Sequence, residues 1–297
     1  MIGWPDTRRV AMAIFIALVV GVGLGLRSAD PSRADPPVAA DRMATLRATA
    51  AAADGAVTRL NMALASALDH ARLGAALTVA GDADPAAELI LAAERLAADS
   101  TTADAARRSL AALAGTTAAI APGTAVPALD YNTPGLLVIA TQLRASAEAA
   151  TVFVARRHAT EAIIEALGRA LAALDRDLPA SALEGLDTAT APMQLLEAWE
   201  GRPQLMQYWM TTSGRLLEAA RGIATATLAG DPANVKAAAA RYAEAAKLAQ
   251  GADNALAVSL SEEGAAVSGT PLRRLAVAAS EAKDLRAALQ PLVHGGS

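Results

Sequence analysis

Apolar residues recur every three or four positions along most of this chain, which is the spacing of one face of an α-helix. The clearest stretch runs from Leu136 to Leu178. Its steps of three and four continue over 43 residues, and only Ser146, Arg157 and Thr160 among the repeat positions are polar. We interpret the stretch as the packing face of a long helix in a bundle or coiled coil. Its polar positions are interpreted as a register-fixing or solvated patch, with a buried site as the alternative.

The same spacing predicts helices along the rest of the chain, and no stretch shows the alternation of a strand. Shorter helices are expected over residues 41–80, 85–98, 101–120 and 209–227. A further helix is expected over 232–265, with an interruption near Gly251, and a last one after 271. The sequence therefore predicts an all-α fold, an elongated antiparallel bundle of long Ala-rich helices.

Glycine, proline and aspartate mark the expected ends of these helices. Asp84 is a suitable N-cap before Pro85, and Thr101 with Asp104 is similar to a capping box. Loops are expected over two stretches, 121–134 and 179–192. At Gly269-Thr270-Pro271 one helix is expected to end and the next to begin.

An uncharged apolar run, Val10–Leu26, lies near the start of the chain and follows Arg8 and Arg9. Its 17 residues would make about 25 Å of helix, against about 30 Å for the hydrocarbon core of a bilayer. We therefore predict an uncleaved membrane anchor, a transmembrane signal-anchor helix. The alternative is a signal peptide that is cleaved near Ala34, which would leave a secreted protein.

The position of this run divides the chain into an anchor and a large remaining part. Residues 1–9 form a short tail, 27–40 a Pro-rich spacer, and 41–297 the helical bundle. Basic residues before the run favour a cytoplasmic N-terminus, so we expect a single-pass protein of a bacterial-type cell membrane with its bulk outside the cytoplasm. Gly21 and Gly25 have the G-x-x-x-G spacing of membrane-helix pairs, which is compatible with a homodimer.

Two segments far apart in the sequence resemble each other. Residues 71–82 and 220–231 are identical at seven of twelve positions, and an Asp-Pro pair follows or ends each of them. This similarity favours two related halves, 41–178 and 192–291.

Composition narrows the expected chemistry. Hydrophobic residues make up 54% of the chain but aromatic residues only 3%, so Ala supplies much of a thin core. The net charge is −4 and the charges are scattered, which does not favour binding to nucleic acid. The chain has no Cys, and we find no nucleotide-binding or catalytic motif. We therefore expect neither an enzyme nor a bound cofactor.

Large side chains cluster between residues 193 and 210. Trp199, Tyr208 and Trp209 lie there with three Met residues and Arg202. Aromatic, Met and Arg side chains are common at binding hot spots, but they also fill a core layer where Ala is too small. We place Trp209 in the core. The candidate ligand- or partner-binding residues are Trp199, Arg202, Met206 and Tyr208.

The spacing His158-x-x-Glu161 places an imidazole and a carboxylate on one helix face, which makes these two residues candidate metal ligands. A surface pair on a long helix explains the same spacing. We expect a non-enzymatic interaction or scaffold protein at the cell envelope, with another envelope protein as its partner. The alternatives are a small-ligand or sensory module that uses residues 193–210, and a metal-binding protein. In general plan the chain is similar to the sensory domains of bacterial chemoreceptors, and no motif carries that resemblance further.

Overall fold

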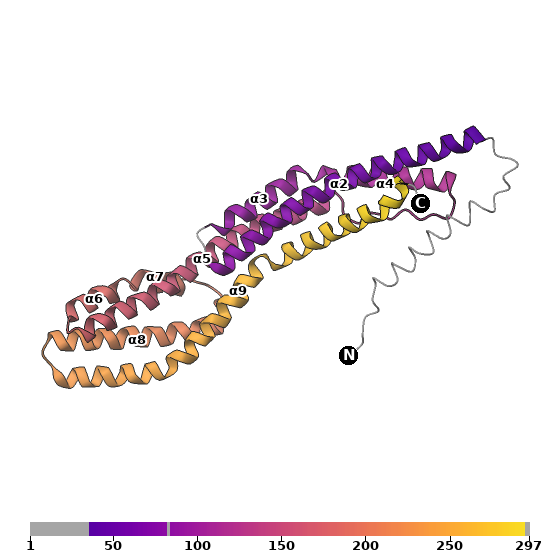
Figure 1. Ribbon diagram of the computed structural model, residues 1–297. Coiled ribbons are helices and arrows are strands. Elements are labelled where there is room, and N and C mark those ends of the chain that lie inside the picture. Colours follow the sequence, from indigo (N-terminus) through magenta and orange to yellow (C-terminus); the bar gives the residue numbers. More distant parts are fainter. Residues whose placement is uncertain (1–35, 82–83, 295–297) are drawn as a thin grey trace, which may run out of the picture. The chain divides into compact units, whose positions relative to one another are not determined.

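The computed structural model describes residues 36–81 and 84–294, which form helices joined by turns and short loops without any strand (Figure 1). The all-α fold class is thus confirmed for this part of the chain, whereas the predicted anchor, 10–26, lies outside the described residues. The helices are α2 (Pro36–Ala80), α3 (Pro85–Ala98), α4 (Thr101–Ile120), α5 (Thr133–Asp175), α6 (Pro179–Asp187), α7 (Thr190–Glu197), α8 (Gln204–Leu228) and α9 (Pro232–His294).

Several predicted helix ends are confirmed. Helices α3 and α4 have the expected bounds, and α2 ends at Ala80 before Gly81, whose φ is +77°. Asp84 is an N-cap, because its Oδ1 accepts a hydrogen bond of 3.0 Å from the N–H of Ala87. Helix α2 begins earlier than expected, so the last residues of the predicted spacer are helical.

The capping box predicted at Thr101 and Asp104 is wrong. Ser100 holds the N-cap position of α4 and makes no side-chain cap bond. The Oδ1 of Asp104 instead accepts a hydrogen bond of 3.4 Å from the N–H of Thr133, at the start of α5. Hydrogen bonding to Thr133 lowers the pKa of Asp104. The carboxylate therefore caps a helix that begins 29 residues later in the sequence.

The loop predicted over 179–192 is also wrong, because α6 and α7 occupy most of it. Pro179 stands at the start of α6, where its missing N–H leaves no hydrogen bond unmade. Ala182 and Leu186 of α6 and Leu196 of α7 are buried. These short helices are stabilised because their apolar residues pack in the core. The local sequence pattern does not reveal this stabilisation.

Helix α9 is continuous through Gly251 and Pro271, so the predicted interruption and the predicted restart are both wrong. A proline inside a helix removes one backbone hydrogen bond and typically destabilises the helix by about 3 kcal/mol. Here Pro271 is itself buried, and Leu275 and Ala278 after it are fully buried. We infer that the burial of the proline and of the residues after it outweighs the lost bond.

The chain divides into two compact units. Unit 1 contains the described residues up to His70, Leu91–Leu143 and those from Pro271 onward; unit 2 contains Ala71–Ile90 and Arg144–Thr270. Each unit draws on both predicted halves, and the duplication stays a prediction.

Alanine and leucine form the core of unit 1. The helical spacing of apolar residues predicted over 41–80 is confirmed in α2, since Leu46, Ala50, Val57, Leu60 and Leu64 are buried. Leu136, Ile139 and Leu143 of α5 and Leu275 and Leu289 of α9 are buried as well.

After Thr160 the buried face of α5 differs from the predicted one. Ile163 is 1% exposed, whereas Ile164, which continues the repeat by a step of four from Thr160, is 51% exposed. Ala159, Ile163 and Ala166 join a core cluster that includes Trp209 of α8. After Thr160 the residues that pack against α5 lie on the adjacent side of the helix. The three–four repeat therefore no longer marks the buried positions.

Helix α5 is also long and apolar enough, by length and composition, to cross a membrane. Its most apolar window has a mean hydropathy of 1.3, and 44% of that window is buried. Core helices of soluble proteins meet the same criterion, so α5 is only weakly compatible with membrane anchoring.

Candidate functional site

Trp209 is a core residue, as its position on the predicted face indicates. Its side chain is 1% exposed and packs in a cluster with Met206, Met210 and Leu196. The indole N–H donates a hydrogen bond of 3.3 Å to Oδ1 of Asp253 on α9. Met206 is fully buried, so this candidate contact residue fills the core and is not displayed at the surface.

Trp199 lies at the edge of the same cluster and contacts a cation. The guanidinium carbon of Arg156 lies 3.8 Å from the centre of the Trp199 ring. The same guanidinium binds Oε1 of Glu263 at 3.0 Å, and both side chains are one-fifth exposed, 20% each. The site therefore joins α5, α9 and the end of α7 through one cation.

Glu263 is only partly satisfied in this arrangement. Its Oε2 is buried without a hydrogen-bond partner, as is the Oγ of Ser259 one turn earlier on α9. Burial raises the pKa of Glu263, and the charge and hydrogen bond of Arg156 oppose that shift without cancelling it. No sequence motif predicted this pair, because Arg156 and Glu263 are 107 residues apart.

Replacing Glu263 with glutamine should change how stability depends on pH. Because the folded-state pKa of Glu263 is raised, its protonated form favours folding, and this contribution is lost as the pH rises from below the ordinary value of 4.5 through the folded-state pKa. The unfolding free energy of E263Q minus that of the wild type should therefore increase across this window and level off above it. Urea unfolding at several pH values measures the difference, with the exposed neighbour E262Q as control. A flat or falling difference for E263Q would contradict the assignment.

The other two candidate contact residues have separate surroundings. Nη1 of Arg202 donates hydrogen bonds to the carbonyl oxygens of Leu196, Glu197 and Trp199, at 3.1, 2.6 and 3.4 Å. It therefore caps the end of α7. Tyr208 is 40% exposed. None of the four candidates lines any of the four best-formed cavities of the described residues, and a binding role for them stays a prediction.

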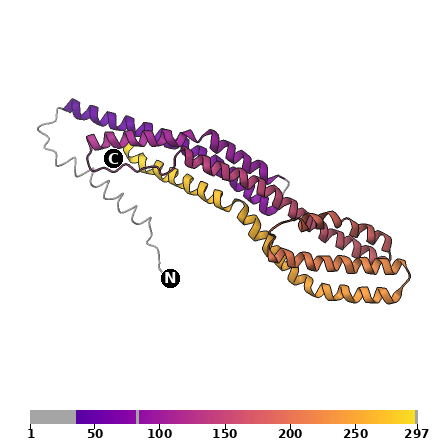
Figure 2. The ribbon, with the colours of Figure 1, turned by 180° about the vertical axis from the view of Figure 1, so that it is seen from behind.

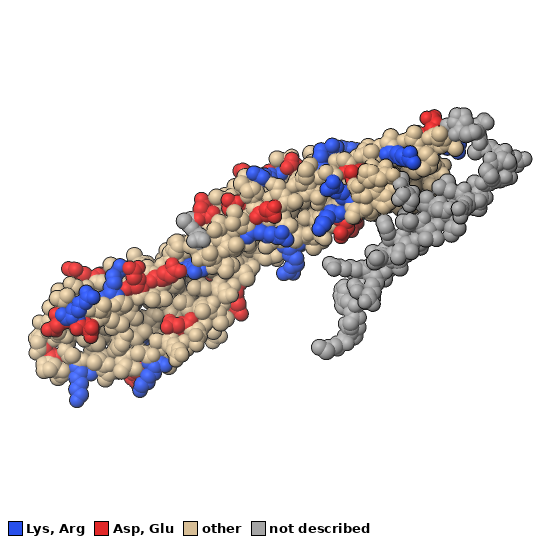
Figure 3. Space-filling view, viewed as in Figure 1, with Lys and Arg blue, Asp and Glu red and all other residues tan. Residues whose placement is uncertain are grey.

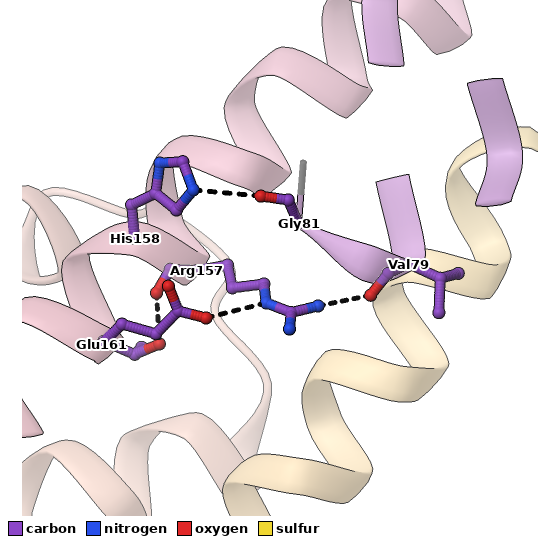
Figure 4. Close-up of polar contacts among 6 residues, drawn as sticks. Val79, Gly81, Arg157, His158 and Glu161 are labelled. Carbon is purple, nitrogen blue, oxygen red and sulfur yellow. Dashed lines mark hydrogen bonds and ion pairs between the residues drawn. The ribbon is translucent and has the colours of Figure 1, made fainter. Parts of the chain in front are cut away.

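His158 and Glu161 lie beside the end of α2 (Figure 4). Nε2 of His158 is 3.1 Å from the carbonyl oxygen of Gly81. Oε1 of Glu161 accepts a hydrogen bond of 3.0 Å from Nε of Arg157, whose Nη1 binds the carbonyl oxygen of Val79. Basic side chains near the last carbonyls of a helix stabilise its C-terminus. Within 36–81 and 84–294 no group of three or more His, Cys, Asp or Glu residues could hold a metal ion, so the geometry lends the metal prediction no support.

A groove that the sequence reasoning missed lies between α8 and the first part of α9, which run side by side in both views (Figures 1 and 2). Its volume is about 400 Å³. The floor consists of Ala219, Gly222, Ala238 and Ala245, with Leu248 at one end. Four exposed charged residues form its walls: Arg215, Glu218, Arg241 and Glu244.

Contacts between α8 and α9 fix how their residues face each other. A Cβ on Gly222 would lie 3.3 Å from the Cβ of Ala238. Trp209, which precedes Gly222 on α8, donates a hydrogen bond to Asp253, which follows Ala238 on α9. The two helices therefore run antiparallel. Counted from the Gly222–Ala238 contact, which lies within the groove, Arg215 is level with Ala245, next to Glu244, and Glu218 is level with Tyr242, next to Arg241.

None of the four wall residues forms an ion pair or hydrogen bond with another described side chain; the ion pairs of unit 2 that the structure shows involve other residues. Both signs of charge are also interspersed over the face of the molecule that Figure 3 shows. A sequence signal for the groove exists: Arg-x-x-Glu occurs at 215–218 and at 241–244, on either side of the turn at Gly230. Helical spacing places each pair on one face.

Comparison of the chain with models of protein families, with curated proteins and with solved structures finds no match.

Proposed function

We propose that this chain is a non-enzymatic interaction or scaffold protein of the cell envelope. In this proposal residues 10–26 anchor it in the membrane. Residues 41–297 form an elongated antiparallel helical bundle outside the cytoplasm, and its surface binds another protein. The length and apolar character of the run at 10–26 support the anchor.

The observation that carries the proposal is the groove between α8 and α9. It combines a floor of small apolar residues with four exposed charged side chains that have no ion-pair partner among the described residues. Small residues allow another backbone to approach closely, and charges around an apolar strip select the partner and its register. A groove of this kind, lined over 215–222 of α8 and 238–248 of α9, offers another protein an apolar floor between charged walls.

Site-specific photo-crosslinking tests this proposal in cells that make the full chain. A photoreactive phenylalanine derivative at Leu248, which is 43% exposed at the end of the groove, should give one discrete adduct. Val258 is the matched control, since it is 48% exposed on the same helix but does not line the groove. With the photoreactive residue at position 258, the adduct seen at position 248 should be absent.

The charged walls supply a second control. If the groove binds the partner, the double variant R215E/R241E should lose the adduct formed at position 248, because all four wall residues then carry negative charge. Equal adducts at both positions, or no adduct at 248, would overturn the proposal.

A further inference from the structure

We propose that the groove between α8 and α9 binds the same groove of a second copy of this chain. This inference rests on the proposed function, because it names the partner of that interaction surface. It is carried by the signs of the four wall charges and by the antiparallel register of the two helices.

The four wall charges alternate around the groove. Along α8, Arg215 precedes Glu218, and along α9, Arg241 precedes Glu244. Because the helices run antiparallel, Arg215 lies across from Glu244 and Glu218 across from Arg241. Each of the four charged residues, one at each corner of the groove, therefore has neighbours of opposite charge both along its own helix and across the groove. The walls carry no net charge.

An alternating set of four charges is complementary to its own copy in a face-to-face two-fold dimer. A two-fold axis parallel to the helices places Arg215 of one copy over Glu244 of the other, and Glu218 over Arg241. A two-fold axis across the helices places Arg215 over Glu218 and Arg241 over Glu244. Both arrangements pair opposite charges at every corner, which is the self-complementarity that an isologous interface requires.

The floor of the groove suits such a contact. Ala219, Ala238 and Ala245 are buried and small, and Gly222 has no side chain. Leu248 stands exposed at the end of the groove and would bury apolar area against the second copy.

Charge variants of the full chain in detergent test the inference by sedimentation velocity. The all-acidic variant R215E/R241E and the all-basic variant E218R/E244R each place like charges at every corner of the dimer. Each should dimerise more than about tenfold more weakly than the wild type. An equimolar mixture of the two should form a heterodimer of wild-type affinity, because opposite charges then meet again.

Two further variants complete the design. The fully inverted chain R215E/E218R/R241E/E244R restores the alternation and should dimerise alone. K236E/K247E is the matched control: it changes the net charge as R215E/R241E does, at exposed positions of α9 outside the groove, and should dimerise like the wild type. Far-ultraviolet circular dichroism confirms that each variant keeps its helices.

Three results would overturn the inference. One is a monomeric wild type, and another is a dimer that R215E/R241E leaves unchanged, which would place the contact elsewhere, such as at Gly21 and Gly25. The third is a mixture that stays monomeric while the wild type dimerises. The inference can also fail while the proposed function stands: a crosslinked adduct at Leu248 whose mass is not that of two copies would keep the interaction surface and exclude self-association.

Discussion

Replacing Trp209 with alanine should lower the free energy of unfolding of unit 2 by about 3–5 kcal/mol. Trp209 is the largest of the fully buried side chains, at 1% exposed. Its neighbours include several Ala residues, which are too short to fill the space that an indole leaves. The variant also removes the hydrogen bond to Asp253, but Asp253 is exposed and water can replace that donor. Urea unfolding followed by circular dichroism and by tryptophan fluorescence measures the loss.

The adjacent residue provides the control. Tyr208 precedes Trp209 on α8 and is 40% exposed, so Tyr208→Ala should change stability by about 0.5 kcal/mol or less. Similar losses for the two variants would show that the aromatic cluster is not arranged around a buried Trp209.

Replacing Gly74 with alanine should destabilise the protein by about 1–3 kcal/mol. An added Cβ would lie 2.7 Å from Cγ of Leu89 and 3.0 Å from the carbonyl oxygen of Pro85. Leu89 is fully buried and the Pro85 oxygen belongs to the backbone, so neither can move aside easily. Alanine normally favours a helix over glycine by about 1 kcal/mol, and the overlap must exceed that gain. Thermal and urea unfolding both measure the net effect.

Gly55 is the control on the same helix. No atom lies within 4 Å of a Cβ added there, so Gly55→Ala should stabilise the protein by about 0.5–1 kcal/mol. Opposite signs for the two substitutions test the close approach of α3 to α2 at Gly74. A stabilising Gly74→Ala would rule that approach out.

Features that depend on neighbouring residues in the sequence were predictable. The apolar face of α2 and the N-cap at Asp84 each require only a helical period or one side chain within reach of the backbone. The same reasoning failed at Pro271 and at α6, where burial against distant segments outweighs the local preference. It also misplaced the buried face of α5 after Thr160, because a repeat read from sequence assumes one set of packing partners along the whole helix.

In the candidate site, too, contacts between distant segments could not be predicted from the sequence. Sequence reasoning selected Trp199 and Arg202 from their residue types, and the structure places both at the end of α7. It could not find Arg156 and Glu263, whose pairing depends on how α5 and α9 pack. The groove was within reach, because Arg-x-x-Glu on both sides of the Gly230 turn needs only a helical period and a reversal of the chain.

The mass of the adduct formed by a photoreactive residue at position 248 tests the central claim most directly. If the groove between α8 and α9 is an interaction surface that binds a second copy, crosslinking of the full chain should give a species of twice the 30.0 kDa chain mass. That species should disappear in R215E/R241E and return when this chain is mixed with E218R/E244R. The absence of any adduct at position 248, in a chain whose circular dichroism shows intact helices, would contradict the account.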